Sequence, residues 1–112
     1  MPNIHLSVIS HTTQNGIAYQ HLRFQIATDD HLIEPPDLKD LTLPPALDFS
    51  QGVVIEGKGP IWLYGHLVHE CHPAAWVACY DPRLGAVVVS AHTRQVQVGQ
   101  ILALTLPVAP VP

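Results

Sequence analysis

A chain of 112 residues is long enough for one domain with a modest core. Its net charge of −4 with neutral histidines, and its five Lys and Arg residues, argue against a grip on long duplex DNA, which depends on many phosphate contacts. No apolar run approaches the about 18 residues needed to cross a bilayer, and the lack of a basic, apolar leader predicts a cytoplasmic protein.

The first 28 residues are predicted to form a β-hairpin. Ile4 to Ile9 alternates apolar and polar residues, as a half-buried strand does. Gln14-Asn15-Gly16 follows, and Asn-Gly is the strongest short-range signal for a hairpin turn. Ala18 to Ala27 alternates again, which places these residues largely on one side: Ala18, Gln20, Leu22, Phe24 and Ile26.

Residues 29–51 are predicted to be a proline-rich connection. Two Pro-Pro pairs fall between Asp29 and Phe49. Such dense proline excludes a helix interior and a central strand. A connection this long in a small domain is usually functional or forms part of an interface.

Residues 52–104 are predicted to form an α/β core. A strand at Val53–Ile55, a helix at Ile61–Cys71 and a buried strand at Ala74–Tyr80 follow one another. This order predicts a β-α-β crossover onto a parallel strand pair. Pro60 suits the first helical turn, since its φ is already helical, and the helix should stop before Pro73.

The predicted helix has two faces. Five side chains fall on one apolar arc: Ile61, Tyr64, Leu67, Val68 and Cys71. Four lie on the opposite side: Trp62, His66, His69 and Glu70. Gly65 weakens a helix, so it is predicted to mark a close approach by another element.

The closing part of the chain contains a turn and two strands. Asp81 to Gly85 has turn residues, Gly85–Ser90 is a valine-rich strand, and a last strand is predicted at Ile101–Leu104. Residues 105–112 form a proline-rich tail that is expected to be frayed or extended. The fold class is therefore α/β: one small domain, with a hairpin, a crossover and closing strands in one mixed sheet.

One polar cluster has the composition of a reactive site. His66, His69 and His72 recur at three-residue steps, and Asp81 and Arg83 follow in the turn. Imidazole and carboxylate bind divalent metals, Arg suits a phosphate oxygen, and His transfers protons near neutral pH. The helix end and the turn are expected to meet at the carboxyl edge of the strands. Spacing alone leaves two interpretations open: a metal or catalytic site, or scattered surface histidines.

Other residues in this region have competing roles. Asp81 is open to a purely local role as the cap of its own turn. Trp62 and Tyr64 are both suited to base stacking or to packing, and the place of Tyr64 on the apolar arc favours the core. Cys71 and Cys79 are predicted to be small buried apolar residues. Five histidines are assigned to the surface or to strand edges, of which the last can join the site: His5, His11, His21, His31 and His92.

The segment from Gly52 to Gln100 resembles a known family. The resemblance is carried by GVVIEGKGPIW, the HECHP step, WVACYDPRLG and the SAHT…VGQ ending. These motifs are similar to those of the small CRISPR-associated ring nucleases of type III systems, first described as manganese-dependent RNA deadenylases. The sequence departs from that pattern at Gln100, where relatives often carry an acid, and His66 has no firm counterpart.

The resemblance implies a function. Such proteins form dimers, and cyclic tetra-adenylate is cleaved between two dimers at a composite site, which removes the second messenger; longer assemblies and trimming of RNA 3′ ends are further expectations. A largely uncharged surface, with 12% charged residues, agrees with burial against copies of the chain. The resemblance implies these catalytic residues: His69, His72, Asp81 and Arg83. It implies Mn²⁺, or another divalent ion, on His69, His72 and Asp81. Substrate-binding residues are expected at Lys58, Trp62, Arg83 and His92.

Three alternatives remain open at this point. The same interface suits a non-catalytic module that senses or sequesters cyclic adenylate or RNA. The proline-rich connection and the aromatic residues suit a purely structural oligomer. A metallohydrolase of other substrates is the third, which the length of the resemblance makes less favoured.

Overall fold

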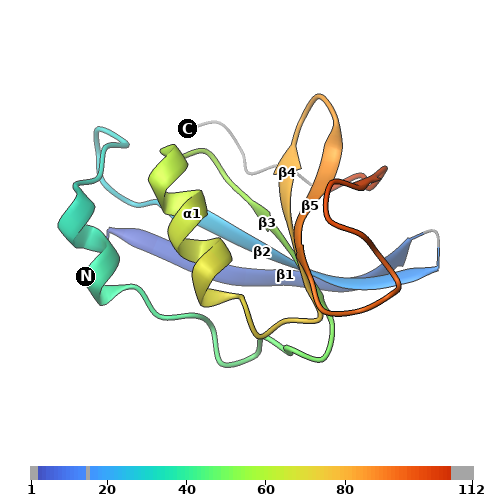
Figure 1. Ribbon diagram of the computed structural model, residues 1–112. Helices are drawn as coiled ribbons and strands as arrows, with labels where there is room; N and C mark the ends of the chain where they lie inside the picture. The colour runs from blue at the N-terminus through green and yellow to red at the C-terminus, as the bar shows by residue number, and fades with distance from the viewer. Residues whose placement is uncertain (1–2, 15, 107–112) are drawn as a thin grey trace.

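The computed structural model describes residues 3–14 and 16–106. Six strands form one sheet in the order of the chain, from β1 to β6 (Figure 1). The elements are β1 (Ile4–Gln14), β2 (Ile17–Ile26), the 3-10 helix η1 (Pro35–Asp40), β3 (Gly52–Glu56), α1 (Ile61–Glu70), β4 (Trp76–Asp81), β5 (Gly85–Ala91) and β6 (Ile101–Leu102). No helix among the described residues is long and apolar enough to span a bilayer.

The sheet is mixed, which confirms the predicted fold class. β2 pairs parallel with β3, and β3 pairs parallel with β4 across α1. The other three pairings are antiparallel. The predicted hairpin is present, with Gln14 opposite Ile17, and Gly16 has the left-handed φ of 77° that a tight hairpin turn needs. β1 extends to Gln14, five residues beyond the predicted strand.

One face of the sheet is covered by α1 and by the proline-rich connection. Leu22, Phe24, Val53 and Ile55 of the sheet pack with Leu63 of the helix. Apolar side chains of the connection pack against this cluster: Ile33, Leu38, Leu41, Leu43, Leu47 and Phe49. The connection therefore helps to close the core, and it contains a 3-10 helix that proline density had not led us to expect. Pro35 and Pro36 occupy the first two positions of this 3-10 helix, where a missing N–H costs nothing.

The opposite face is covered by the C-terminal part of the chain. Tyr19, Val54 and Trp76 lie in a second buried cluster. The residues that cover them come from the closing segment: Val96, Leu102, Leu104 and Leu106. β6 is shorter than predicted, and Leu106, in the tail that was expected to be frayed or extended, is buried. The remainder of the predicted tail, residues 107–112, lies outside the described residues.

The buried stripe of α1 differs from the predicted arc. Leu63, Leu67 and Cys71 recur every four residues and are fully buried, whereas Ile61 is 86% exposed. Pro60 has an extended ψ of 155° and is the N-cap, so the helix begins at Ile61 rather than one residue earlier. The first helical side chain then lies beyond the packed layer, because the helix meets the sheet only from its third residue onward.

The prediction for Gly65 was wrong within this chain. A Cβ at this exposed position has no atom within 4 Å, so no other element approaches it closely.

Gly65→Ala is therefore expected to raise the free energy of unfolding by about 0.5–1 kcal/mol, because alanine restricts the unfolded chain and favours a helix. Urea denaturation measures this change. A destabilised variant would contradict the assignment of open space beside Gly65.

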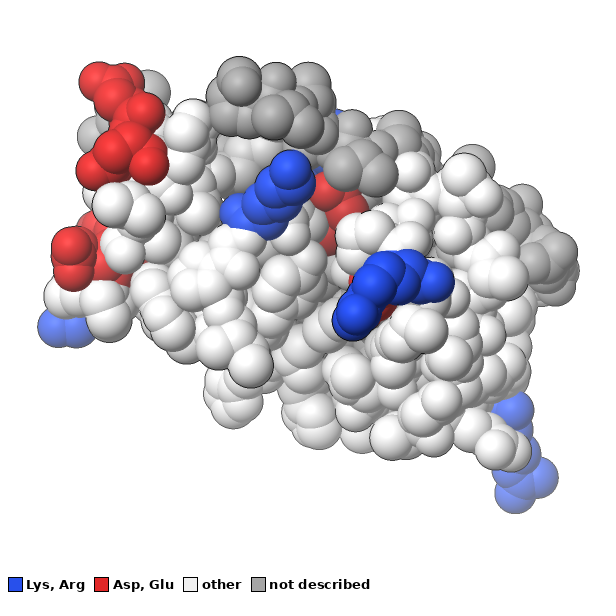
Figure 2. All heavy atoms as spheres, turned by 90° about the horizontal axis from the view of Figure 1, so that it is seen from above, with Lys and Arg blue, Asp and Glu red and all other residues white. Residues whose placement is uncertain are grey.

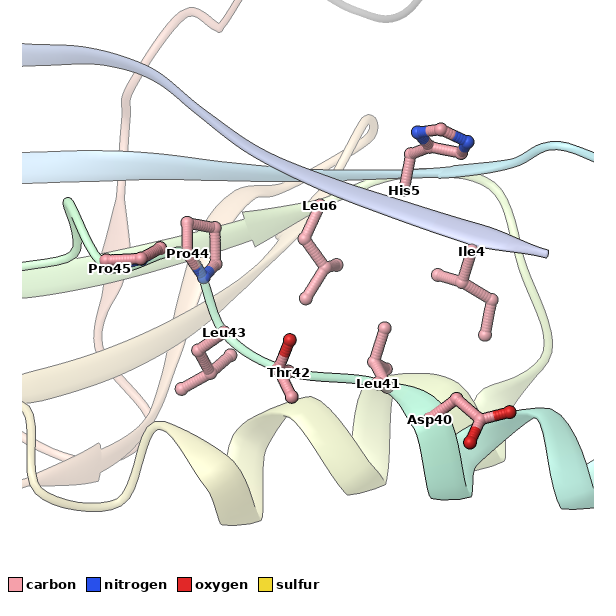
Figure 3. Close-up of a pocket in the computed structure, with 9 residues that line it drawn as sticks. All are labelled: Ile4, His5, Leu6, Asp40, Leu41, Thr42, Leu43, Pro44 and Pro45. Carbon is pink, nitrogen blue, oxygen red and sulfur yellow. The ribbon is translucent and has the colours of Figure 1, made fainter. Parts of the chain in front are cut away.

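A groove of about 240 Å³ lies between β1 and the proline-rich connection (Figure 3). Ile4 and Leu6 point from β1 toward Leu41, whereas His5 points to the other side of the strand. The groove contains none of the predicted site residues, and β1 is three strands away from β4 in the sheet. The candidate chemistry therefore lies elsewhere.

Candidate functional site

The predicted site residues lie at two opposite edges of the sheet. Because β3 and β4 are parallel, α1 starts at their carboxyl edge and ends at their amino edge. His69 and His72 at the end of α1 therefore lie at the amino edge, whereas Asp81 ends β4 at the carboxyl edge. β4 has six residues, so at about 3.3 Å per residue its ends are about 16 Å apart. The expectation that the helix end and the turn meet at the carboxyl edge was wrong.

Histidines gather at the amino edge. The rings of His72 and His92 are in edge-to-face contact, with their centroids 4.9 Å apart. The backbone N–H of His92 donates to the carbonyl of Ala75 at 2.8 Å, which fixes the end of β5 beside the start of β4. His69, His72 and His92 are all exposed. His92 thus lies beside His72, a possibility that the sequence had left open.

These histidines do not complete a metal site in one protomer. Among residues 3–14 and 16–106, no group of three or more His, Cys, Asp or Glu residues is arranged to hold a metal ion. His66 is half-buried and its Nε2 lies 4.0 Å from Glu70 Oε1, so it faces along its own helix. A manganese site made of His69, His72 and Asp81 from a single protomer is excluded by the separation of the two edges.

The turn after β4 is held by Asp81. Its Oδ1 accepts the backbone N–H of Arg83 at 2.7 Å, and the guanidinium of Arg83 approaches at 3.4–3.5 Å. The backbone N–H of Arg83, and then its side chain, lower the pKa of Asp81, so the carboxylate is ionised at neutral pH. The local capping role of Asp81 is confirmed. The Arg83 side chain is 86% exposed, so its long contact with Asp81 leaves it available at the surface.

Lys58 lies at the same edge as Asp81 and Arg83, in the loop between β3 and α1, and is exposed. Figure 2 views the molecule from above and therefore looks onto this edge. It shows basic side chains beside acidic ones within a largely uncharged surface.

Trp62 is the second residue of α1. It is half-buried and packs against the core cluster.

The sequence missed a buried polar network under this edge. His21 was expected at the surface but is fully buried, and its Nε2 lies 2.7 Å from Glu56 Oε1. Arg23 Nε donates to the same oxygen at 3.0 Å. Burial raises the pKa of Glu56, but the hydrogen bonds from His21 and Arg23 lower it more, so the net pKa lies below its usual value. Nδ1 of His21 is buried without a hydrogen-bond partner.

A sequence signal for this network did exist. His21 and Arg23 alternate with Leu22 and Phe24 in β2, and Glu56 ends an apolar strand. Alternation shows that the polar pair shares one face, but only the parallel register of β2 and β3 brings Arg23 opposite Glu56.

Both cysteines are free. Burial raises the pKa of Cys71 to about 12, and burial also raises the pKa of the half-buried Cys79. The prediction of a small buried apolar residue is confirmed for Cys71 and holds in part for Cys79.

Comparison with known proteins identifies similar sequences. A family model described as CRISPR-associated protein (Cas_csx3) matches residues 26–103. An uncharacterized protein of Aquifex aeolicus (strain VF5) is 40% identical over 85 residues, which covers 72% of this chain and 74% of that protein. The segment matched by the family model includes His72 and His92 at the amino edge and the turn of Asp81 and Arg83 at the carboxyl edge.

Proposed function

The chain belongs to the CRISPR-associated Csx3 family, and from that premise we propose that it is a ring nuclease that cleaves cyclic tetra-adenylate at a site shared by two protomers. Family membership gives the protein a CRISPR-associated role. Within that role, cleavage of the cyclic messenger would end the antiviral signal of a type III system. Trimming of adenylates from RNA 3′ ends is a related phosphodiesterase activity that the same site would support.

The observation that carries the proposal is the separation of the candidate groups. His72 and His92 lie in contact at the amino edge, whereas Asp81 and Arg83 lie together at the carboxyl edge. Phosphodiester cleavage needs a proton-transfer group and a group that neutralises the phosphate at the same phosphorus. The two sets can meet only when the amino edge of one protomer faces the carboxyl edge of another. This favours a dimer that assembles to a tetramer, or a longer array, around the ring.

The proposed mechanism assigns a role to each set. Arg83 of one protomer neutralises the scissile phosphate, for which a largely exposed guanidinium is suited. A 2′-hydroxyl or a water attacks phosphorus as a histidine of the facing protomer accepts its proton, and the bond from phosphorus to the leaving 5′-oxygen breaks. His69 or His72 of the facing protomer transfers the proton that the leaving oxygen requires. Lys58 and Trp62 contact the ring, by charge and by stacking.

The described residues of one protomer do not form a manganese site. His69 and His72 from one protomer with Asp81 from another would supply nitrogen and oxygen ligands of the kind that Mn²⁺ accepts. A divalent ion bound there would supply polarisation of the scissile phosphate. Metal dependence is therefore part of the proposal and belongs to the assembled state.

The test is incubation of the pure protein with cyclic tetra-adenylate, with and without Mn²⁺, followed by chromatography of the products. Linear products that form only with Mn²⁺ are the expected result. Linear products in both samples would support the nuclease activity and contradict its dependence on Mn²⁺. An intact ring in both samples would overturn the cleavage proposal.

A second candidate function is a non-catalytic sensor of cyclic adenylate. The incomplete metal set within one protomer favours it, since binding needs the exposed cations but no metal. Co-elution of an intact ring with the protein would identify a sensor. Absence of both cleavage and co-elution would leave a structural oligomer.

A further inference from the structure

We propose that Tyr64 is a positioning residue for ligand binding: its hydroxyl holds the loop Gly57–Gly59 so that Lys58 is fixed for contact with a phosphate of the ring. This inference rests on the proposed function, because it takes the cyclic adenylate as the anion that Lys58 meets. It adds a residue that never touches the ligand itself.

The first support is a pair of hydrogen bonds to one residue of the loop. The Tyr64 hydroxyl donates to the carbonyl of Gly57 at 2.6 Å and accepts the N–H of the same residue at 3.1 Å. Burial raises the pKa of Tyr64 to about 12, so the hydroxyl stays neutral and keeps both its donor and its acceptor functions at physiological pH. One side chain therefore satisfies both backbone groups of Gly57.

The second support is the packing beneath the loop. A Cβ at Gly57 would lie 2.5 Å from the carbonyl oxygen of Phe24, and a Cβ at Gly59 would lie 2.7 Å from the Phe24 ring. The loop thus lies directly on Phe24. The rings of Phe24 and Tyr64 meet edge to face, with centroids 5.1 Å apart. Phe24 supports the loop from below, while Tyr64 holds its first residue.

The third support is the anchor that precedes the loop. Glu56 is buried and is hydrogen-bonded by His21 and Arg23 from the neighbouring strand. The backbone is therefore fixed immediately before Gly57. Lys58, between two glycines, is exposed even though its flanking residues are constrained. Glycine-flanked backbone is otherwise the most flexible kind, and a flexible loop must be ordered at a cost when its lysine binds an anion.

The experiment is a double-mutant cycle on ring affinity. Tyr64→Phe removes the hydroxyl and keeps the ring against Phe24, and Lys58→Ala removes the cation. Equilibrium affinity for cyclic tetra-adenylate is measured without divalent metal for the wild type, both single variants and the double variant. Lys58→Ala is expected to weaken binding about tenfold and Tyr64→Phe about three- to tenfold, and the double variant should bind about as weakly as Lys58→Ala alone. Lys39→Ala, which removes an exposed lysine of η1, is the matched control and should leave affinity unchanged.

Two results would overturn the inference. Wild-type affinity in folded Tyr64→Phe, even with a lowered melting temperature, would make Tyr64 merely structural. Losses that multiply in the double variant would show that Tyr64 does not act through Lys58.

A readout without ligand separates this inference from the proposed function. Hydrogen exchange of the amide of Gly57, whose N–H donates to the Tyr64 hydroxyl at 3.1 Å, should be at least about tenfold faster in Tyr64→Phe, with the centre of α1 unchanged. Unchanged exchange would reject the positioning role even if the wild type cleaves the ring. Faster exchange in a protein that binds no ring would reject the proposed function, and with it the role of Lys58 in ring binding, while retaining Tyr64 as the residue that holds the loop.

Discussion

Purified His72→Ala and Asp81→Asn proteins are each expected to cleave cyclic tetra-adenylate at least about a hundredfold more slowly than the wild type. His72→Ala removes the proposed proton-transfer group at the amino edge. Asp81→Asn removes the carboxylate charge at the other edge but keeps side-chain oxygen for the N–H of Arg83, which Asp81 accepts at 2.7 Å. Both side chains lie at the surface or near it, so both variants should keep the thermal stability of the wild type within a few degrees.

An equimolar mixture of these two inactive variants is expected to recover activity. The defects lie at opposite edges, so an interface between the intact amino edge of one variant and the intact carboxyl edge of the other is fully wild type. Random pairing gives such a site at about a quarter of positions. Chromatographic cleavage assays on the separate and mixed proteins measure this recovery.

Two outcomes would contradict this proposal. Near-normal turnover in both single variants would show that neither His72 nor Asp81 takes part in cleavage. Two inactive variants that stay inactive when mixed, although size-exclusion chromatography shows that they associate, would reject a site shared between protomers. His5→Ala, which changes an exposed histidine on β1, is the matched control for His72→Ala and should retain full activity.

Glu56→Ala is expected to lower the free energy of unfolding by about 3–5 kcal/mol. Glu56 is 4% exposed, and one of its oxygens accepts hydrogen bonds from both His21 and Arg23. Removal of the carboxylate leaves a buried imidazole without its partner and takes a hydrogen bond from a largely buried guanidinium, which is costlier than the loss of the pair itself. Urea denaturation at neutral pH measures the change.

The matched controls separate charge from packing. Glu56→Gln keeps the shape and an acceptor oxygen, so it should cost less than Glu56→Ala. Glu70→Ala removes a glutamate whose side chain is 42% exposed and whose Oε1 lies 4.0 Å from His66 Nε2, so it should change stability by no more than about 0.5 kcal/mol. A Glu56→Ala protein as stable as the Glu70→Ala protein would show that the network contributes nothing net.

The contribution of Glu56 should also depend on pH, with a sign that follows from its lowered pKa. A carboxyl group whose pKa is lower in the folded state stabilises the fold above its unfolded pKa, and that contribution is lost as pH falls through the folded value. The stability difference between the wild type and Glu56→Gln should therefore be largest near neutral pH and shrink below about pH 4.5. A difference that grows with acid would mean that the carboxyl pKa is raised.

The sequence by itself determined the order and type of most elements. The Asn-Gly turn, the alternating strands, the helix before His72-Pro73 and the valine-rich β5 all depend on backbone preferences and side-chain periodicity that act over a few residues. Those local rules place the hairpin and the crossover correctly. Residue type singles out one polar cluster, which also contains His66, and only the resemblance to the family implies His69, His72, Asp81 and Arg83 within it.

Only the tertiary structure decided where those groups lie relative to one another. The parallel pairing of β3 and β4 sends α1 back across the sheet, which separates His72 from Asp81 by the length of a strand although nine positions separate them in the chain. The register of β2 against β3 buries His21 with Glu56, and the point at which α1 meets the sheet leaves Ile61 in solvent. Each of these results depends on contacts between residues far apart in sequence, and such contacts cannot be predicted from local periodicity.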